Sequence, residues 1–259
     1  MLTLPGLPPQ ASEHAPHIDQ VLGLEHLMML VLALFWGGYF IYVLIRFRSG
    51  RQTEANYAGM KGRWSVYLVF LVAMAEGVLL VGYEIPQWRE RVYDVPSASN
   101  AIVIRVIAQQ FAWNVHYPGA DGRFGRTDIA LVSSDNPIGL DPRDADAKDD
   151  VTTINQLTVP VGHPVVVHLT SMDVVHSFGV YELRVKQDAT PGVDSIVWFV
   201  PTVTTAEMRK RTNNPDFQYE ITCSQLCGLG HFRMRGFLNV VTDAEYQQFL
   251  ADEAPAPRP

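Results

Sequence analysis

The chain has 259 residues, which is enough for one or two domains. With 47% hydrophobic and 18% charged residues it is too apolar for a disordered chain, and its net charge of −7 disfavours nucleic acid as a partner. It has two cysteines, which excludes a disulfide-dense secreted scaffold.

Two long apolar runs in the first third of the chain predict membrane-spanning helices. The first has no charged residue from Leu27 to Ile45, and the second, from Trp64 to Tyr83, is interrupted only by Glu76. Helices of about 20 residues cross a hydrocarbon core roughly 30 Å thick. The alternative is a pair of buried helices in a soluble protein, but such helices rarely stay uncharged over this length.

Glu76 lies midway through the second run. An ionisable group inside a membrane is costly and is a functional candidate by default. We predict that Glu76 faces another subunit and not lipid, and that it is protonated or hydrogen-bonded there; the functional interpretation is a role in proton movement. The alternative is a neutral carboxyl that only positions helices.

The charges between the two runs predict their orientation. The connection 46–63 carries five basic residues and one acidic residue, whereas no Lys or Arg precedes the first run. Positive-inside reasoning places this connection in the cytoplasm and both termini on the outer side, the periplasm of a bacterium. The first run lacks a basic n-region before it, so we expect a retained anchor and not a cleaved signal peptide. The expected segments are an external arm (1–20), a transmembrane hairpin (21–88), an external domain (89–250) and a tail (251–259).

Beyond residue 100, short β-branched runs alternate with turn signals and predict an all-β sandwich or barrel. A short terminal helix is expected over 243–250, opened by an Asp or Thr cap. The expected strands are Ala101–Ile107, Val159–Thr170 (a strand pair or one bent strand, broken at Gly162 and Pro164), Val193–Val200, Phe217–Thr222 and Gly236–Val241.

The segment between Tyr117 and Thr152 is rich in Gly, Asp and Pro and is longer than an ordinary connection between strands. Three interpretations are open. It is a solvated surface loop, an acidic face that docks a partner or subunit, or a calcium loop. The acids do not follow EF-hand spacing, which counts against the last.

The chemistry is concentrated between Cys223 and Met234, where two thiols, an imidazole and a thioether lie within twelve residues. Soft sulfur donors with imidazole select copper, zinc or iron–sulfur centres, and Met with His and Cys is typical of copper electron-transfer sites. Two thiolates with this spacing can bridge a pair of copper ions, which requires a second imidazole. His176, in a loop after the strand around 165–170, is the best candidate.

Two alternatives remain for the cysteines. They form a disulfide in an oxidising compartment, or the chain is a thioredoxin-like copper chaperone. In such chaperones the cysteines precede the histidine, whereas His176 comes before Cys223 and Cys227 here.

The pattern His176 … Cys-Ser-x-x-Cys-Gly-x-x-His-x-x-Met resembles the binuclear copper site, CuA, of cytochrome c oxidase subunit II. The resemblance covers nearly the whole chain. It implies two N-terminal transmembrane helices followed by an external cupredoxin-like β-sandwich. The two copper ions would then be bridged by Cys223 and Cys227, and each ion would be bound by one histidine, His176 or His231. The ligand set would be completed by Met234 and the backbone carbonyl of Gln225. Asp173 would support the ligands.

The resemblance also implies the function. Members of this family accept electrons from cytochrome c at CuA and pass them to a haem in subunit I, where oxygen is reduced to water and protons are translocated. The expected partners are subunit I, other oxidase subunits, membrane lipid and a separate cytochrome c. Because no Cys-x-x-Cys-His occurs in the chain, no covalent haem is expected.

Two departures from the family pattern affect the expected sites. Gln225 stands where a Glu usually helps to hold magnesium at the contact with subunit I. Phe111 stands where a Trp usually receives the electron, so that electron entry is expected through Trp113 or Phe111. The rival functions are a membrane-anchored protein that stores or delivers copper for oxidase assembly, and a structural quinol-oxidase subunit, which would have lost these ligands.

Overall fold

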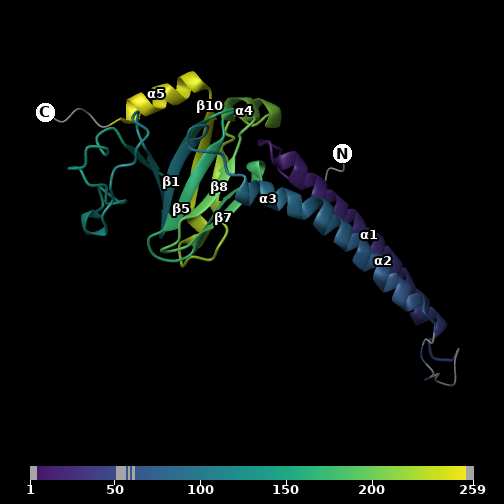
Figure 1. Cartoon of the computed structure of the whole chain (residues 1–259). Helices are drawn as coiled ribbons and strands as arrows, with labels where there is room; N and C mark the ends of the chain where they lie inside the picture. The colour runs from purple at the N-terminus through teal and green to yellow at the C-terminus, as the bar shows by residue number, and fades with distance from the viewer. Residues whose placement is uncertain (1–4, 51–56, 58, 60–61, 255–259) are drawn as a thin grey trace. The chain divides into compact units, whose positions relative to one another are not determined.

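The computed structural model describes residues 5–50, 57, 59 and 62–254 and divides the chain into two compact units. The first unit holds the helices of residues 17–90, and the second joins residues 8–16 to the chain from residue 91 onward (Figure 1). Much of the predicted cytoplasmic connection 46–63, most of the tail 251–259 and the start of the arm lie outside the described residues.

Two helical runs are long and apolar enough to cross a membrane. The first is α1 (Ala15–Arg46); the second, Trp64–Tyr93, is continuous through α2 (Trp64–Leu79), the π-helical segment η1 (Leu80–Glu84) and α3 (Ile85–Tyr93). Their large apolar side chains lack cover within the chain, as at Leu34 and Phe70, which are 68% and 69% exposed. Lipid or other subunits must therefore cover these helices.

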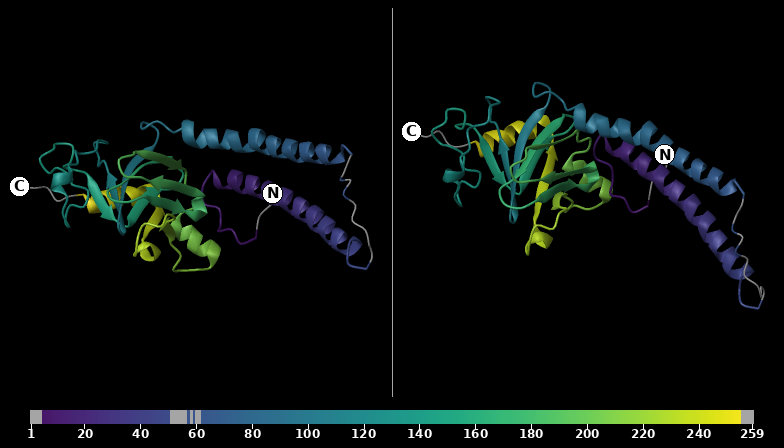
Figure 2. Two further views of the ribbon diagram at one scale, coloured as in Figure 1. Left: turned by 90° about the horizontal axis from the view of Figure 1, so that it is seen from below. Right: turned by 60° about the horizontal axis from the view of Figure 1, so that its bottom comes forward.

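The second unit is a sandwich of two five-stranded sheets (Figures 1 and 2). The strand orders are β3-β2-β1-β5-β8 and β4-β10-β9-β6-β7. β1 pairs with β5 in parallel, as β4 does with β10, and the other pairings are antiparallel. The strands are β1 (Ile102–Gln109), β2 (Ala112–Tyr117), β3 (Val151–Ile154), β4 (Gln156–Pro160), β5 (Val165–Ser171), β6 (His176–Val180), β7 (Val185–Ala189), β8 (Ser195–Phe199), β9 (Tyr219–Cys223) and β10 (Arg235–Val241).

The core lies between the sheets and explains why these residues form strands. Side chains alternate between buried and partly exposed along β1, so that Ile104, Val106 and Ala108 point inward. The facing sheet contributes wholly buried residues such as Phe178 and Leu238. Two apolar faces packed in this way form a rigid scaffold on which ligand side chains can be fixed.

The predicted fold class, two apolar N-terminal helices followed by a β-sandwich, is confirmed. The terminal helix α5 (Asp243–Glu253) begins with a capping box between Thr242 and Glu245, and it contacts the edge strands β3 and β4 (Figure 2). The sequence did not predict β2, β3, β6, β7 or the helix α4 (Thr205–Thr212). In β6 all five residues are buried, so that the alternation that identifies a half-buried strand is missing.

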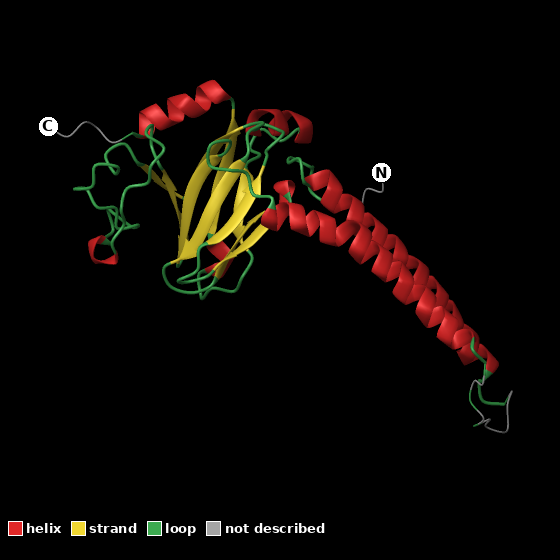
Figure 3. Cartoon of the chain, viewed as in Figure 1, coloured by secondary structure: helices red, strands yellow, loops and turns green. Residues whose placement is uncertain are grey.

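The connection between β2 and β3, residues 118–150, is a structured lobe despite having little regular structure (Figure 3). The amide of Asn136 donates to the carbonyls of Leu131 and Leu140. Asp141 accepts hydrogen bonds from the side chains of Arg126, at 2.6 Å, and Arg143, at 3.2 Å. We call residues 118–150 the acidic lobe.

A buried pair holds the end of the acidic lobe against β2. His116 Nε2 lies 2.6 Å from Asp150 Oδ2, and both side chains are wholly buried. The same carboxylate oxygen accepts the backbone N–H of Gly125 at 2.8 Å. One carboxylate therefore joins the beginning and the end of the lobe to the sheet.

Residues 8–16, of which the last two are the first residues of α1, belong to the same unit as the β-sandwich; we call them the N-terminal strap. The backbone N–H of Ala11 donates to Glu182 O, and that of Thr202 donates to Ala11 O, both at 2.9 Å. Ser12 Oγ donates to Leu183 O at 2.7 Å, and Ala11 is wholly buried in the core. The segment before α1 and the domain after α3 therefore belong to one folded unit.

Candidate metal centre

The pairing of three strands brings the candidate ligands to one end of a sheet. Cys223 ends β9, and the loop 224–234 closes the hairpin between β9 and β10. On the other side of β9, strand β6 begins at His176, and Phe178 lies opposite Cys223 in the register. The sequence predicted His176 in a loop after the strand around 165–170, but in the structure it is the first residue of β6.

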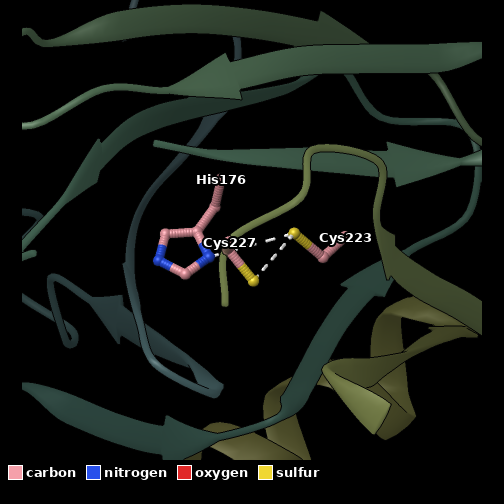
Figure 4. A group of neighbouring side chains, drawn as sticks. All are labelled: His176, Cys223 and Cys227. Atoms are coloured by element: carbon pink, nitrogen blue, oxygen red, sulfur yellow. Dashed lines mark hydrogen bonds between the residues drawn. The ribbon is translucent and has the colours of Figure 1, made fainter. Parts of the chain in front are cut away.

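The donor atoms of this cluster lie within a few ångströms of one another. His176, Cys223 and Cys227 form a group whose ligand atoms all lie within 4.8 Å of each other, and Figure 4 shows the imidazole directed at the two sulfurs. The two Sγ atoms are 3.8 Å apart. Cys223 Sγ lies 3.9 Å from His176 Nδ1 and 3.2 Å from Gln225 O. Cys227 Sγ lies 3.7 Å from both His231 Nδ1 and Met234 Sδ. His176 Nδ1 lies 3.1 Å from Met234 Sδ.

These separations fit a pair of ions that share two thiolates. Donor atoms held at about 2.0–2.3 Å from one tetrahedral ion lie roughly 3.3–3.8 Å apart. His176 Nδ1 and Met234 Sδ form one neighbouring pair of donors, and the Gln225 carbonyl with His231 Nδ1 supplies a second set around the same thiols. Cysteine, histidine and methionine together are soft donors suited to copper.

Asp173 determines the orientation of His176. Its Oδ1 atom lies 2.9 Å from His176 Nε2, on the side of the ring away from the sulfurs. A carboxylate at this nitrogen favours the tautomer that carries its proton on Nε2, which leaves the Nδ1 lone pair directed at the cluster. The sequence-based expectation that Asp173 supports a ligand therefore has a geometric counterpart, although its role in metal binding stays a prediction.

The centre is shielded from water but lies close to the surface. His176 is wholly buried and Met234, Cys227 and Cys223 are 3%, 4% and 9% exposed. Burial, followed by the adjacent Cys223, raises the pKa of the Cys227 thiol to about 11. Both thiols are free in the structure, so an arriving metal ion must displace their protons.

The outer side of the ligand loop is apolar. Leu226, Leu229 and Phe232 are 78%, 98% and 86% exposed, although each follows or precedes a buried ligand by one or two residues. We call these three side chains the apolar rim. An exposed apolar group of this kind marks a contact surface for another protein.

The two expected electron-entry residues occupy different environments. Trp113 is wholly buried, with its ring 6.2 Å from that of His176 and 5.6 Å from that of Phe178. A protein that donates electrons therefore cannot contact the Trp113 side chain directly. Phe111 is partly exposed and packs against Gly230, where a Cβ atom would collide with its ring.

Gln110, to which sequence analysis assigns no role, lies beside the ligand loop in the structure. Its side-chain amide donates to the carbonyl of Cys227 at 2.7 Å, across 117 residues of chain. No spacing rule connects the turn between β1 and β2 with the loop after β9, so that only the folded arrangement reveals this contact.

Comparison with known proteins identifies related chains. Residues 102–241 match the family described as cytochrome c oxidase subunit II, periplasmic domain. The alternative cytochrome c oxidase subunit 2 of Bradyrhizobium diazoefficiens is 33% identical over 218 residues, covering 83% of this chain and 72% of the relative. The haem-copper oxidase subunit 2 of Aeropyrum pernix is 28% identical over 222 residues, covering 80% and 77%.

A solved structure with a similar chain is the periplasmic domain of subunit II of cytochrome oxidase (CoxB) of Bradyrhizobium japonicum. It is 26% identical, with a TM-score of 0.42, and the match covers 61% of this chain and 96% of that one.

The match over 102–241 and the relative at 33% identity define a class of membrane-anchored subunits of respiratory oxidases. The chain belongs to the cytochrome c oxidase subunit II family. It is therefore an electron-transport protein that associates with other oxidase subunits, as the resemblance in the sequence predicted.

Proposed function

We propose that this subunit receives electrons from a cytochrome c through a binuclear copper centre and passes them to the haem of subunit I. The observation that carries the proposal is the pair of buried thiols 3.8 Å apart, each with an imidazole Nδ1 atom within 3.9 Å. A copper pair held by these thiols and imidazoles would supply one-electron transfer with small reorganisation. Copper ligation is assigned to His176, Cys223, Gln225 (through its carbonyl), Cys227, His231 and Met234.

The chain's own contribution is to hold the donors rigidly and to exclude water. Cys223 and His176 are fixed by adjacent strands, and Asp173 orients the imidazole. A rigid, buried donor set keeps the geometry the same in both oxidation states, which lowers the cost of electron transfer. The rival storage protein would need an accessible site that opens to release its metal.

The surface of the β unit supports a protein donor. The apolar rim belongs to the loop 224–234 that carries the ligands, and the acidic lobe has exposed carboxylates such as Asp135. We propose that these acids steer a basic cytochrome c by long-range attraction and that the final contact is apolar, with Phe111 at the point of entry.

The placement in the membrane is likewise a proposal. The N-terminal strap belongs to the same folded unit as the β-sandwich, which supports a common side for the two ends of the helical hairpin. With the basic connection in the cytoplasm, the copper domain lies in the periplasm. Gln225 offers a neutral amide where a carboxylate would bind magnesium, so we do not assign magnesium to this position.

The spectrum of the purified oxidase tests the proposed centre. A copper pair that shares one unpaired electron gives visible absorption and an EPR signal split by two copper nuclei, whereas stored Cu(I) is colourless and silent. Cys227→Ser should abolish this signal, because a hydroxyl is too hard and too basic to bridge Cu(I). An unaltered two-copper spectrum in Cys227→Ser would contradict the assignment.

A further inference from the structure

The turn between β1 and β2 reaches both halves of the donor set through one residue, Gln110. Its backbone N–H donates to Asp173 Oδ2 at 2.7 Å, and the other oxygen of that carboxylate holds His176 Nε2 at 2.9 Å. Its side-chain amide donates to the carbonyl of Cys227 at 2.7 Å. The two contacts come from one residue, and one ends on the carboxylate that orients the ligand His176 while the other ends on the backbone of the ligand Cys227.

The contact with Cys227 controls a peptide plane next to a bridging sulfur. Gly228 follows Cys227 with φ +135°, a conformation that favours glycine. A Cβ atom there would lie 2.7 Å from Gln110 Nε2, so the glycine is needed for this approach. Fixing the Cys227 carbonyl fixes the backbone from which the Cys227 side chain projects, and therefore the direction of its sulfur.

We propose that Gln110 is a positioning residue for the copper centre, which links the Asp173–His176 pair to the Cys227 end of the ligand loop. The proposal rests on the binuclear centre assigned above. Hydrogen bonds from outside the ligand set that orient ligands affect metal affinity by about 10–100-fold. Gln110 is itself exposed, so its substitution should leave the core of the β-sandwich intact.

The test compares three variants in the purified, copper-loaded oxidase. Gln110→Met keeps the length and neutral charge of the side chain but cannot donate, Gln110→Lys retains a donor, and Gln109→Met makes the same change one residue earlier. The readouts are the rate of copper release to a chelator, the copper hyperfine splitting in EPR, and the unfolding temperature of the copper-free complex. Wild-type protein must first show the two-copper signal; its absence would reject the proposed function and not the role of Gln110.

We expect Gln110→Met to release copper about tenfold faster and to change the hyperfine splitting, with the unfolding temperature of the copper-free complex unchanged. Gln110→Lys should recover most of the wild-type rate, and Gln109→Met should behave as wild type. Wild-type release and an unchanged EPR signal in Gln110→Met would overturn the proposal. Equal acceleration in Gln109→Met would overturn it as well.

Discussion

We expect Gln225 to act on the copper centre through its backbone carbonyl and not through its side chain. Its carbonyl oxygen lies 3.2 Å from Cys223 Sγ, whereas the residue as a whole is exposed. We therefore expect Gln225→Ala to retain copper and an almost unchanged two-copper spectrum, because alanine keeps the carbonyl. Copper content and EPR of the purified oxidase measure this. Loss of copper would show that the amide side chain takes part in binding.

Residues that carry distinctive chemistry, and Asp173 beside one of them, could be predicted from the sequence, whereas Gln110 could not. Two cysteines, a histidine and a methionine within twelve residues identify a soft metal site before any fold is known. His176 was found because the pair of ions needs a second imidazole. Gln110 is invisible at this level, since glutamine has many uses and its partner Cys227 is 117 residues away. The burial of Trp113 was equally beyond reach, because it depends on the packing of both sheets.

Strands with a clear β-branched or alternating apolar pattern were predicted from the sequence, whereas β6, which carries His176, was not. β1 and β5 carry long β-branched runs, and their positions agree with the expected ones. β6 supplies His176 but is short and buried throughout, so that no period distinguishes it from a loop. Its place beside β9 follows from sheet pairing across 40 or so residues, which local propensity does not encode.

The acidic lobe should depend on pH through Asp141. The Arg126 guanidinium, followed by the backbone N–H of Arg143, holds the pKa of Asp141 well below its usual range. A carboxyl whose pKa is lower in the folded state contributes stability that is complete above its unfolded pKa of about 4 and is lost as the pH falls toward the folded value. The lobe should therefore loosen progressively below about pH 4.

Asp141→Asn should reproduce this loosening at neutral pH. We expect amide hydrogen exchange in residues 126–144 to be severalfold faster in the variant at pH 7, with the ligand loop unaffected. The exposed Asp135 provides the control, because Asp135→Asn removes the same charge without breaking the contacts of Asp141. After correction for intrinsic exchange, the difference between Asp141→Asn and wild type should shrink below pH 4. Identical amide exchange in Asp141→Asn and wild type at pH 7 would contradict the role of Asp141 in holding the lobe together.

We predict that Glu76 connects the membrane unit to the activity of the oxidase. It lies within α2 and is exposed on this chain, so that another subunit or lipid must meet it. We predict that Glu76→Gln slows oxygen consumption while the donor still reduces the copper centre at the wild-type rate, since proton movement and electron entry are separate steps. Stopped-flow reduction and steady-state turnover measure the two. An unchanged rate of oxygen consumption in Glu76→Gln would mean that this carboxyl only positions helices.

The N-terminal strap should stabilise the β-sandwich from outside its own stretch of sequence. Ala11 is wholly buried, so that Ala11→Asp places an unpaired carboxylate in the core and should cost on the order of 3 kcal/mol. Calorimetry of the purified oxidase should show a lower unfolding temperature for this domain. Glu13→Gln, at an exposed position of the same strap, should leave that temperature unchanged. Equal temperatures for Ala11→Asp and wild type would mean that the strap is dispensable.

The strap also ties folding to the order of synthesis. A ribosome makes residues 8–16 first, but their partners Glu182, Leu183 and Thr202 emerge only after both membrane helices have been made. In the periplasmic placement proposed above, the strap must therefore cross the membrane early and stay without its partners until most of the chain has crossed as well. A delay in moving the first residues through the bilayer would then leave the β-sandwich complete except for the strap, with the backbone groups beside residues 182 and 202 unpaired, so that insertion of the amino terminus would determine when the domain completes its fold.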